Sequence, residues 1–134
     1  MIRINIEFKG EPDIPPSHLS FEYKDEIDEI TFCNVVNIIK QKLSRHLKIN
    51  LYETLTIYCS YIIEDLRSKK SVVDIQQNAK KLLVSDNVMI GVPHLLKRII
   101  FQVQLDNDDV FKKLVFEEPL EIDEYIMPTK SLKE

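Results

Sequence analysis

Residues 54–65 read TLTIYCSYIIED, and the fold of the chain depends on the structure of this stretch. Every second residue from Leu55 to Cys59 is apolar, which is the period of a strand with one buried face. The apolar segment 61–63 follows after a very short connection and predicts a second, shorter strand. The acidic residues 64–65 then end a hairpin, where we expect them to face water.

The segment before this stretch has a helical period. From Thr31, the expected N-cap, apolar residues recur at gaps of three and four residues. They are Phe32, Val35, Val36, Ile39, Leu43 and Leu47. The spacing predicts one amphipathic helix with its apolar side in the core.

The N-terminal segment predicts a hairpin. Every second residue from Ile2 to Phe8 is apolar, and so is every second residue from Leu19 to Tyr23. Each alternation is typical of a strand. Gly10 and three prolines mark a turn region between them, so we expect the two strands to pair.

The segment after residue 65 leaves one alternative open. Residues 71–75 predict a single helical turn, because Ser71 and Asp74 fit a capping pair. Residues 88–92 and residues 99–105 are both candidates for the last, central strand of the sheet. Residues 110–115 then show helical spacing behind a run of aspartates, which favour a helix N-terminus.

Composition limits the classes of function. A chain of 134 residues predicts one compact domain. A net charge of −4 argues against a nucleic-acid surface, and two glycines cannot build a phosphate-binding glycine loop. No apolar run approaches the roughly 20 residues that span a bilayer. We therefore expect neither nucleic acid nor membrane as a partner.

The residues that carry chemistry are scattered. The histidines His18, His46 and His94 fall in three separate segments, and no paired His or Cys spacing indicates a metal. Cys33 and Cys59 are too few for a disulfide framework, so both are expected to be reduced core residues. The sequence predicts no catalytic residues, no metal site and no cofactor.

The order of the expected elements resembles the beta-grasp of ubiquitin and its relatives. Residues 54–65 resemble the strand, tight turn, short strand and acidic end of that family, and residues 71–74 resemble the turn of helix that follows. The resemblance implies an α+β class and a ubiquitin-like beta-grasp, a mixed sheet crossed by one main helix. This domain is expected over residues 1–105, with a C-terminal tail extension over residues 106–134.

The tail is similar to that of the elongin B family. Residues 108–119, DDVFKKLVFEEP, resemble the two aspartates, phenylalanine, leucine and Glu-Pro that follow the ubiquitin-like domain of that family. Residues 124–128, EYIMP, resemble its C-terminal motif. The chain is identified on these motifs as a divergent member of that family.

The resemblance implies an adaptor and not an enzyme. Its implied partner is elongin C, in a heterodimer that links SOCS-box-type substrate receptors to a cullin-RING ubiquitin ligase and serves the elongin transcription elongation complex. The implied location is the nucleus and the cytoplasm. The alternative is a free-standing ubiquitin-like interaction domain that docks on chaperone or proteasome-associated partners through a sheet-face patch containing Leu55, Ile57 and apolar groups from Leu82 to Ile90.

The candidate partner-binding residues are apolar residues outside the expected beta-grasp core. They are Phe111, Leu114, Phe116, Pro119, Tyr125, Ile126, Met127 and Pro128. Two fates stay open for this surface. It either folds back over the sheet and enlarges the core, or packs across a partner, where Tyr, Phe and Met contribute most of the affinity.

Overall fold

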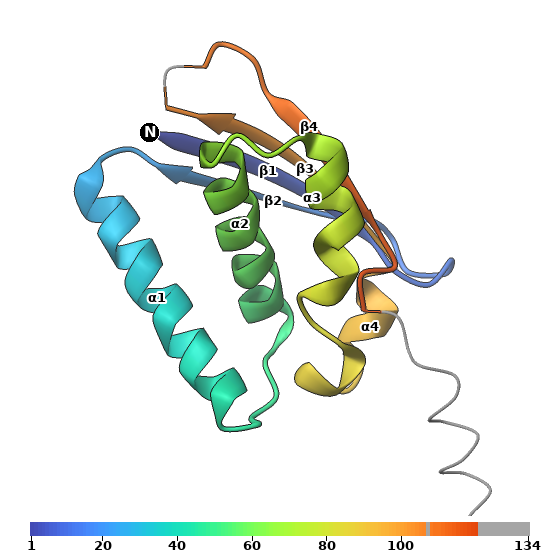
Figure 1. Cartoon of the computed structure of the whole chain (residues 1–134). Helices are drawn as coiled ribbons and strands as arrows, with labels where there is room; N and C mark the ends of the chain where they lie inside the picture. The colour runs from blue at the N-terminus through green and yellow to red at the C-terminus, as the bar shows by residue number, and fades with distance from the viewer. Residues whose placement is uncertain (107, 121–134) are drawn as a thin grey trace, which may run out of the picture.

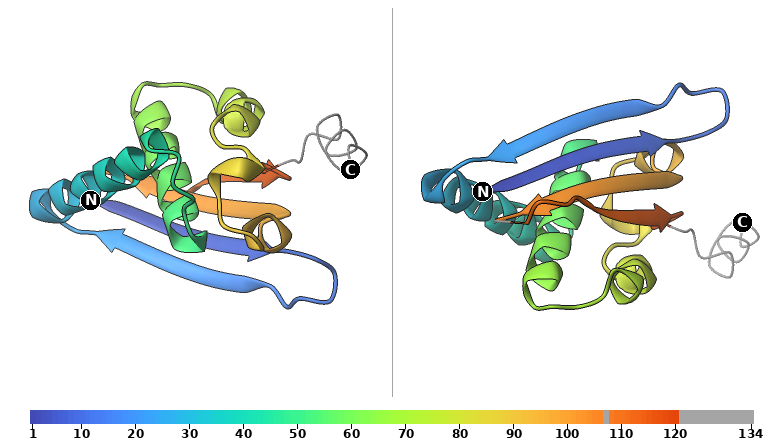
Figure 2. Two further views of the ribbon diagram at one scale, coloured as in Figure 1. Left: turned by 90° about the horizontal axis from the view of Figure 1, so that it is seen from below. Right: turned by 90° about the horizontal axis from the view of Figure 1, so that it is seen from above.

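The computed structural model describes residues 1–106 and 108–120. Helices cover one face of a four-stranded sheet (Figures 1 and 2), which confirms the expected α+β class. The elements are β1 (Ile2–Lys9), β2 (Ser17–Tyr23), α1 (Glu26–Ser44), α2 (Leu51–Arg67), α3 (Val72–Asn78), the 3-10 turns η1 (Ala79–Lys81) and η2 (Ser85–Asn87), α4 (Val92–Leu95), β3 (Arg98–Leu105) and β4 (Lys112–Glu117).

The N-terminal strand lies inside the sheet. The strand order is β2-β1-β3-β4, and β1 pairs antiparallel with both of its neighbours. Ile4, for example, lies opposite Phe21 of β2 and Val103 of β3. The predicted hairpin of the first two strands is confirmed, and the second strand lies at an edge.

One face of the sheet forms the core. The buried side chains of the two central strands are apolar and alternate with side chains on the open face. They are Ile2, Ile4, Ile6, Phe8, Ile99, Phe101, Val103 and Leu105. Arg3 and Glu7 on β1 are exposed on the opposite face. An antiparallel sheet with one covered face has this pattern.

The two strands predicted within residues 54–65 are wrong, because this stretch belongs to helix α2. Asn50 caps the helix by accepting a hydrogen bond from the Glu53 backbone, and the Glu53 side chain accepts one from the Asn50 backbone. This reciprocal cap begins a helix. The helix is buried around much of its circumference, so apolar residues fill neighbouring positions and imitate a period of two.

The structure decides between the two candidates for the central strand. Residues 99–105 belong to β3, whereas residues 88–92 form no strand. Val88 makes only one isolated parallel bridge, to Ile49, and Gly91 has a φ of 100°, which turns the chain into α4. The expected turn of helix after Ser71 is confirmed as α3.

The helix predicted over residues 110–115 is wrong. Residues 112–117 form strand β4, which pairs with β3. Leu114 and Phe116 are buried and Val115 between them is half-buried. This alternation is the burial pattern of a strand and not of a helix. The predicted boundary between the domain and its C-terminal extension, at residues 105 and 106, falls in the connection between β3 and β4. These two strands pair in the same sheet.

The expected beta-grasp is not confirmed. A mixed sheet crossed by one main helix requires parallel strands, but all three strand pairs in the described part of the chain are antiparallel. Two long helices, α1 and α2, lie side by side in place of one (Figure 1). The residues expected to form the third and fourth strands are those of α2, so that topology cannot form.

Helix α1 begins earlier than expected. Asp25, and not Thr31, is the N-cap and accepts a hydrogen bond from the Asp28 backbone. Val36 and Ile39 are buried as expected, whereas Val35 is exposed. Cys59 is a reduced core residue, and its burial raises the pKa of its thiol to about 12. Cys33 is also free, but it is exposed, so the expectation of a core position is wrong there.

Three aromatic rings join α2 to the sheet. The ring centroids of Tyr58 and Phe116 are 5.4 Å apart, and those of Phe101 and Phe116 are 4.9 Å apart. Both pairs are edge-to-face, the arrangement that aromatic rings favour in cores. None of the helices in the described part is long and apolar enough to cross a membrane.

We predict that Ile4→Ala lowers the free energy of unfolding by about 2–5 kcal/mol, because the shortened side chain leaves a cavity between the sheet and the helices. Urea denaturation measures this change. The control is Ile90→Ala at a position that is 99% exposed; it should change stability by no more than about 0.5 kcal/mol. Equal effects of the two substitutions would contradict this description of the core.

Candidate functional site

The described residues contain no cluster suited to catalysis or metal binding. No three His, Cys, Asp or Glu side chains among them gather around one point where a metal ion could bind. Glu64 is exposed and Asp65 is buried on α2, where it pairs with Lys70 at 3.3 Å, so the expected solvated hairpin end is wrong. The described surface instead has two groups of exposed apolar side chains.

The first group lies on helix α1. Ile27, Ile30 and Ile38 are 72%, 55% and 56% exposed, although the same helix also buries Val36 and Ile39. We call Ile27, Ile30, Asn34 and Ile38 the outer stripe of α1. Apolar side chains that share one exposed side of a helix form a candidate interaction surface.

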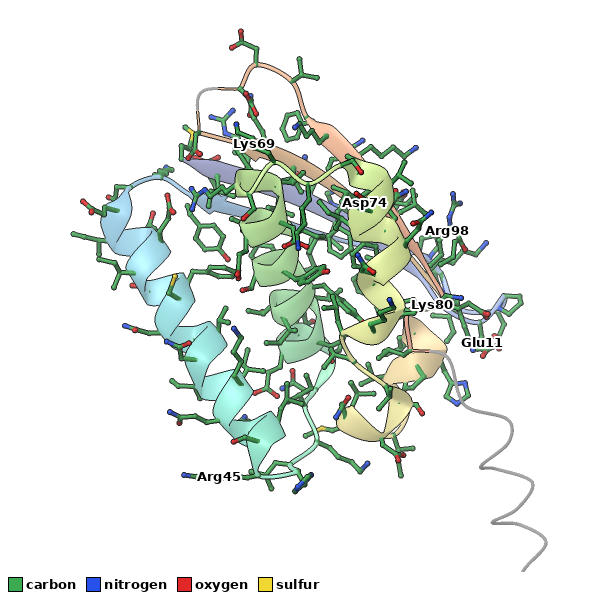
Figure 3. All side chains as sticks on the ribbon, viewed as in Figure 1. Glu11, Arg45, Lys69, Asp74, Lys80 and Arg98 are labelled. Atoms are coloured by element: carbon green, nitrogen blue, oxygen red, sulfur yellow. The ribbon has the colours of Figure 1, made fainter. Side chains whose placement is uncertain are left out.

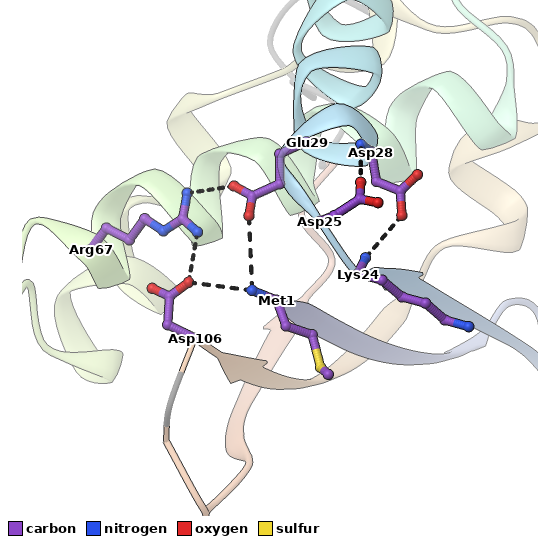
Figure 4. Close-up of polar contacts among 7 residues, drawn as sticks. All are labelled: Met1, Lys24, Asp25, Asp28, Glu29, Arg67 and Asp106. Atoms are coloured by element: carbon purple, nitrogen blue, oxygen red, sulfur yellow. Dashed lines mark hydrogen bonds and ion pairs between the residues drawn. The ribbon is translucent and has the colours of Figure 1, made fainter.

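Ion pairs hold α1 at both ends. Figure 4 shows Arg67 between Glu29 of α1 and Asp106 after β3, at 3.1 and 3.0 Å, with the Met1 amino group beside both carboxylates. At the other end Lys42 pairs with Glu53 of α2 at 2.5 Å. The several charges at the first turn form a network, which holds this end of the helix better than an isolated surface pair would.

The second group surrounds a tight turn before α4. Met89 accepts a hydrogen bond from the Val92 backbone at 3.1 Å, and Gly91 has the left-handed φ of 100° that this turn requires. The turn is tied to the chain before α2 because the Met89 backbone donates to Ile49 at 2.8 Å. At its apex Ile90 is 99% exposed. We call residues 89–92 the Ile90 turn; it presents an isoleucine on a fixed backbone.

The N-terminal hairpin supports this turn through α4. The Glu11 backbone donates to the His94 carbonyl at 2.9 Å, and the Glu11 carboxylate lies 3.1 Å from His94 Nδ1. The hydrogen bond with His94 is the main reason that the pKa of Glu11 lies below its ordinary value. Gly10 permits the contact, because a Cβ there would lie 2.1 Å from the His94 carbonyl oxygen.

The structure separates the predicted partner-binding residues. Leu114, Phe116 and Pro119 are buried, so their side chains take the first fate considered for them and enlarge the core. Phe111 is 40% exposed at the β3–β4 connection. Tyr125, Ile126, Met127 and Pro128 lie outside the described residues, and their role stays a prediction.

The sequence reasoning missed the outer stripe, and it considered residues 82–90 only as part of a sheet-face patch and not as a turn. The signal for the outer stripe was present, because α1 has apolar residues on two sides of the helix and only one side was assigned to the core. The signal for the Ile90 turn was the Gly-Val-Pro sequence at residues 91–93, which is typical of a turn leading into a helix. The described part of this small α+β chain thus has two exposed apolar surfaces of the kind that contact other proteins.

The comparison with protein families identifies the subunit. The family model described as urease, gamma subunit, matches residues 21–118, from β2 through β4. The match covers most of the chain, and the chain therefore belongs to the urease gamma subunit family.

Individual relatives agree. The chain is 34% identical to a urease subunit gamma of Halalkalibacterium halodurans over 84 residues, which are 63% of this chain and 82% of that one. It is 27% identical to a urease subunit gamma of Ureaplasma parvum over 95 residues, 71% and 92% of the two chains. It is also 31% identical to a urease subunit alpha of Helicobacter heilmannii over 75 residues, 55% of this chain but 32% of that longer one.

These findings overturn the functional expectations. The chain is a urease gamma family member and not an elongin B, so the expected partners elongin C, SOCS-box receptors, a cullin and the transcription elongation complex are wrong. The expectation that the protein is not an enzyme is also wrong, because the members of this family are subunits of an enzyme, urease. The free-standing ubiquitin-like alternative fails with the fold, since Leu55 of its proposed sheet-face patch is buried on α2.

We predict that Gly10→Ala lowers the free energy of unfolding by about 1–3 kcal/mol, because the added methyl forces the hairpin away from α4. Urea denaturation measures the loss, and amide chemical shifts at the Ile90 turn should move with it. The control is Asp13→Ala, an exposed position in the same connection. Unchanged stability and unchanged shifts for Gly10→Ala would show that the contact does not support the turn.

Proposed function

We propose that the protein is a subunit of a urease, an enzyme that hydrolyses urea, and that it packs against the other subunits of that enzyme. The observation that carries the proposal is the family match over residues 21–118, which takes in every helix in the described part of the chain. Its contribution to the enzyme is a structured surface, because the described residues contain no group of metal ligands.

The Helicobacter relative supports assembly with a larger subunit. In that protein a segment similar to this chain makes up 32% of a longer chain named urease subunit alpha. There the segment is covalently joined to the rest of the subunit. A gamma subunit that is not joined in this way needs a surface that binds the rest of the enzyme non-covalently.

The Ile90 turn is the surface that we assign to this contact. Its isoleucine is almost fully exposed, yet hydrogen bonds on both sides hold the backbone, so ordering it on binding costs little conformational entropy. Exposed Val84 and Met89 lie on the same connection between α3 and α4. A rigid apolar anchor with apolar neighbours has the character of a binding hot spot.

The experiment combines the chain with the remaining urease subunits of the same organism. We predict co-elution with them in size-exclusion chromatography and release of ammonia from urea by the complex. Ile90→Asp should weaken the association at least about tenfold, a loss of about 1.4 kcal/mol, because it places a charge in an apolar contact. Isothermal titration calorimetry measures this affinity.

The matched control is Val110→Asp. Val110 is 70% exposed, but it follows β3 whereas the Ile90 turn precedes it, so the two lie at opposite ends of the strand. This variant should bind as the unchanged chain does. Separate elution of the unchanged chain would reject the proposed function, and equal affinities of the two variants would reject the assignment of the Ile90 turn.

A further inference from the structure

Helix α1 has two apolar sides, and the fold uses one of them. Ile27, Ile30, Asn34 and Ile38 recur at gaps of three and four residues and therefore lie along one side of the helix. Val36, which is buried, lies on the other side. The outer stripe is thus as regular as the stripe that packs on α2 and β2, but it has no covering segment among the described residues.

The charges along α1 are opposite at its two ends. Its first turn is acidic, with Glu26, Asp28 and Glu29, and Lys42 lies in its last turn. Within the described part of the chain, Glu26 and the C-cap residue Arg45 form no ion pair. Figure 3 shows Arg45 projecting from the end of the helix. A surface that is acidic at one end and basic at the other is complementary to itself when two copies run antiparallel.

We propose that α1 pairs antiparallel with α1 of a second copy of this chain, with Asn34 at the two-fold axis. In that register Ile30 of each copy meets Ile38 of the other. Glu26 of each copy comes within one turn of Arg45 of the other. A two-fold contact requires each surface to be self-complementary, and the outer stripe meets this condition in both its apolar groups and its charges.

Asn34 fits the axis for a chemical reason. Its side-chain amide has both donors and an acceptor, so two copies of the same side chain hydrogen-bond to one another reciprocally. A buried asparagine pair in an otherwise apolar helix seam selects a single register and a two-helix assembly. The isoleucines around it exclude water from the pair.

This contact is distinct from the one proposed for the urease subunits. It joins two copies of the chain and uses α1, whereas the proposed subunit contact uses the Ile90 turn, so either contact can exist without the other. The chain alone is sufficient to test it.

The test is site-specific cross-linking at the axis. Exposed Cys33 is first replaced by Ser, and Asn34→Cys is introduced in that background. Oxidation should yield a disulfide-linked dimer, since residues on a two-fold axis approach their own copies. The matched control is Lys40→Cys in the same background, which lies about 120° around the helix from Asn34 and should stay monomeric on a denaturing gel.

A second measurement does not depend on cysteine. Sedimentation equilibrium of the unchanged chain should give a mass twice the 15.8 kDa of one copy. Ile30→Glu should reduce the dimer association constant at least about tenfold with an unchanged circular dichroism spectrum, because residue 30 is exposed in the single chain.

Two results would overturn the inference. One is a monomeric mass for the unchanged chain, and the other is equal cross-linking of the Asn34→Cys and Lys40→Cys variants. If the chain is monomeric and Ile30→Glu abolishes its binding to the other urease subunits, the outer stripe belongs to that contact and the proposed function still stands.

Discussion

The pairing of β1 with β3 is the interaction on which the rest of the structure depends. β1 lies between β2 and β3, and its four inward side chains are 0–7% exposed. β1 and β3 are the two central strands, so without β1 half of the central surface on which the helices pack would be absent. Yet residues 1–20 precede the segment that matches the urease gamma family. The core of this chain is therefore completed by a strand, β1, that lies before the family match.

The same hairpin links the core to the surface. Its turn reaches α4, where Gly10 and Glu11 meet His94, and α4 begins at the Ile90 turn. The start of β1 and the end of β3 also meet the Arg67 network, which holds the first turn of α1. The Ile90 turn is thus supported by the N-terminal hairpin, and the outer stripe of α1 is supported by the start of β1 and the end of β3. The fold explains in this way how surfaces with few buried side chains keep a fixed geometry.

Sequence reasoning predicted the parts of the fold in which local pattern and burial agree. Strand β1 has one buried face, and its alternation was predicted correctly. The buried positions Val36 and Ile39 of α1 were also predicted correctly, because they follow the helical period on one side of the helix. It failed at α2, where burial on several sides hides the helical period, although the Asn50 and Glu53 cap was readable. It failed at β4 because short apolar runs do not separate helix from strand. Those two errors produced the ubiquitin-like topology, and the family resemblance followed from them. The interaction surfaces depend on which side of each element is already covered, and only the tertiary structure shows that.

Native-state hydrogen exchange of the β1 amides tests the central claim most directly. Amides that open only by global unfolding exchange at the slowest rates in a protein. We predict that the β1 amides bonded to β3 exchange as slowly as the slowest amides of β3 itself. Exchange of β1 at the rate of an exposed loop, with β3 still protected, would show that the hairpin is an appendage and would contradict the account.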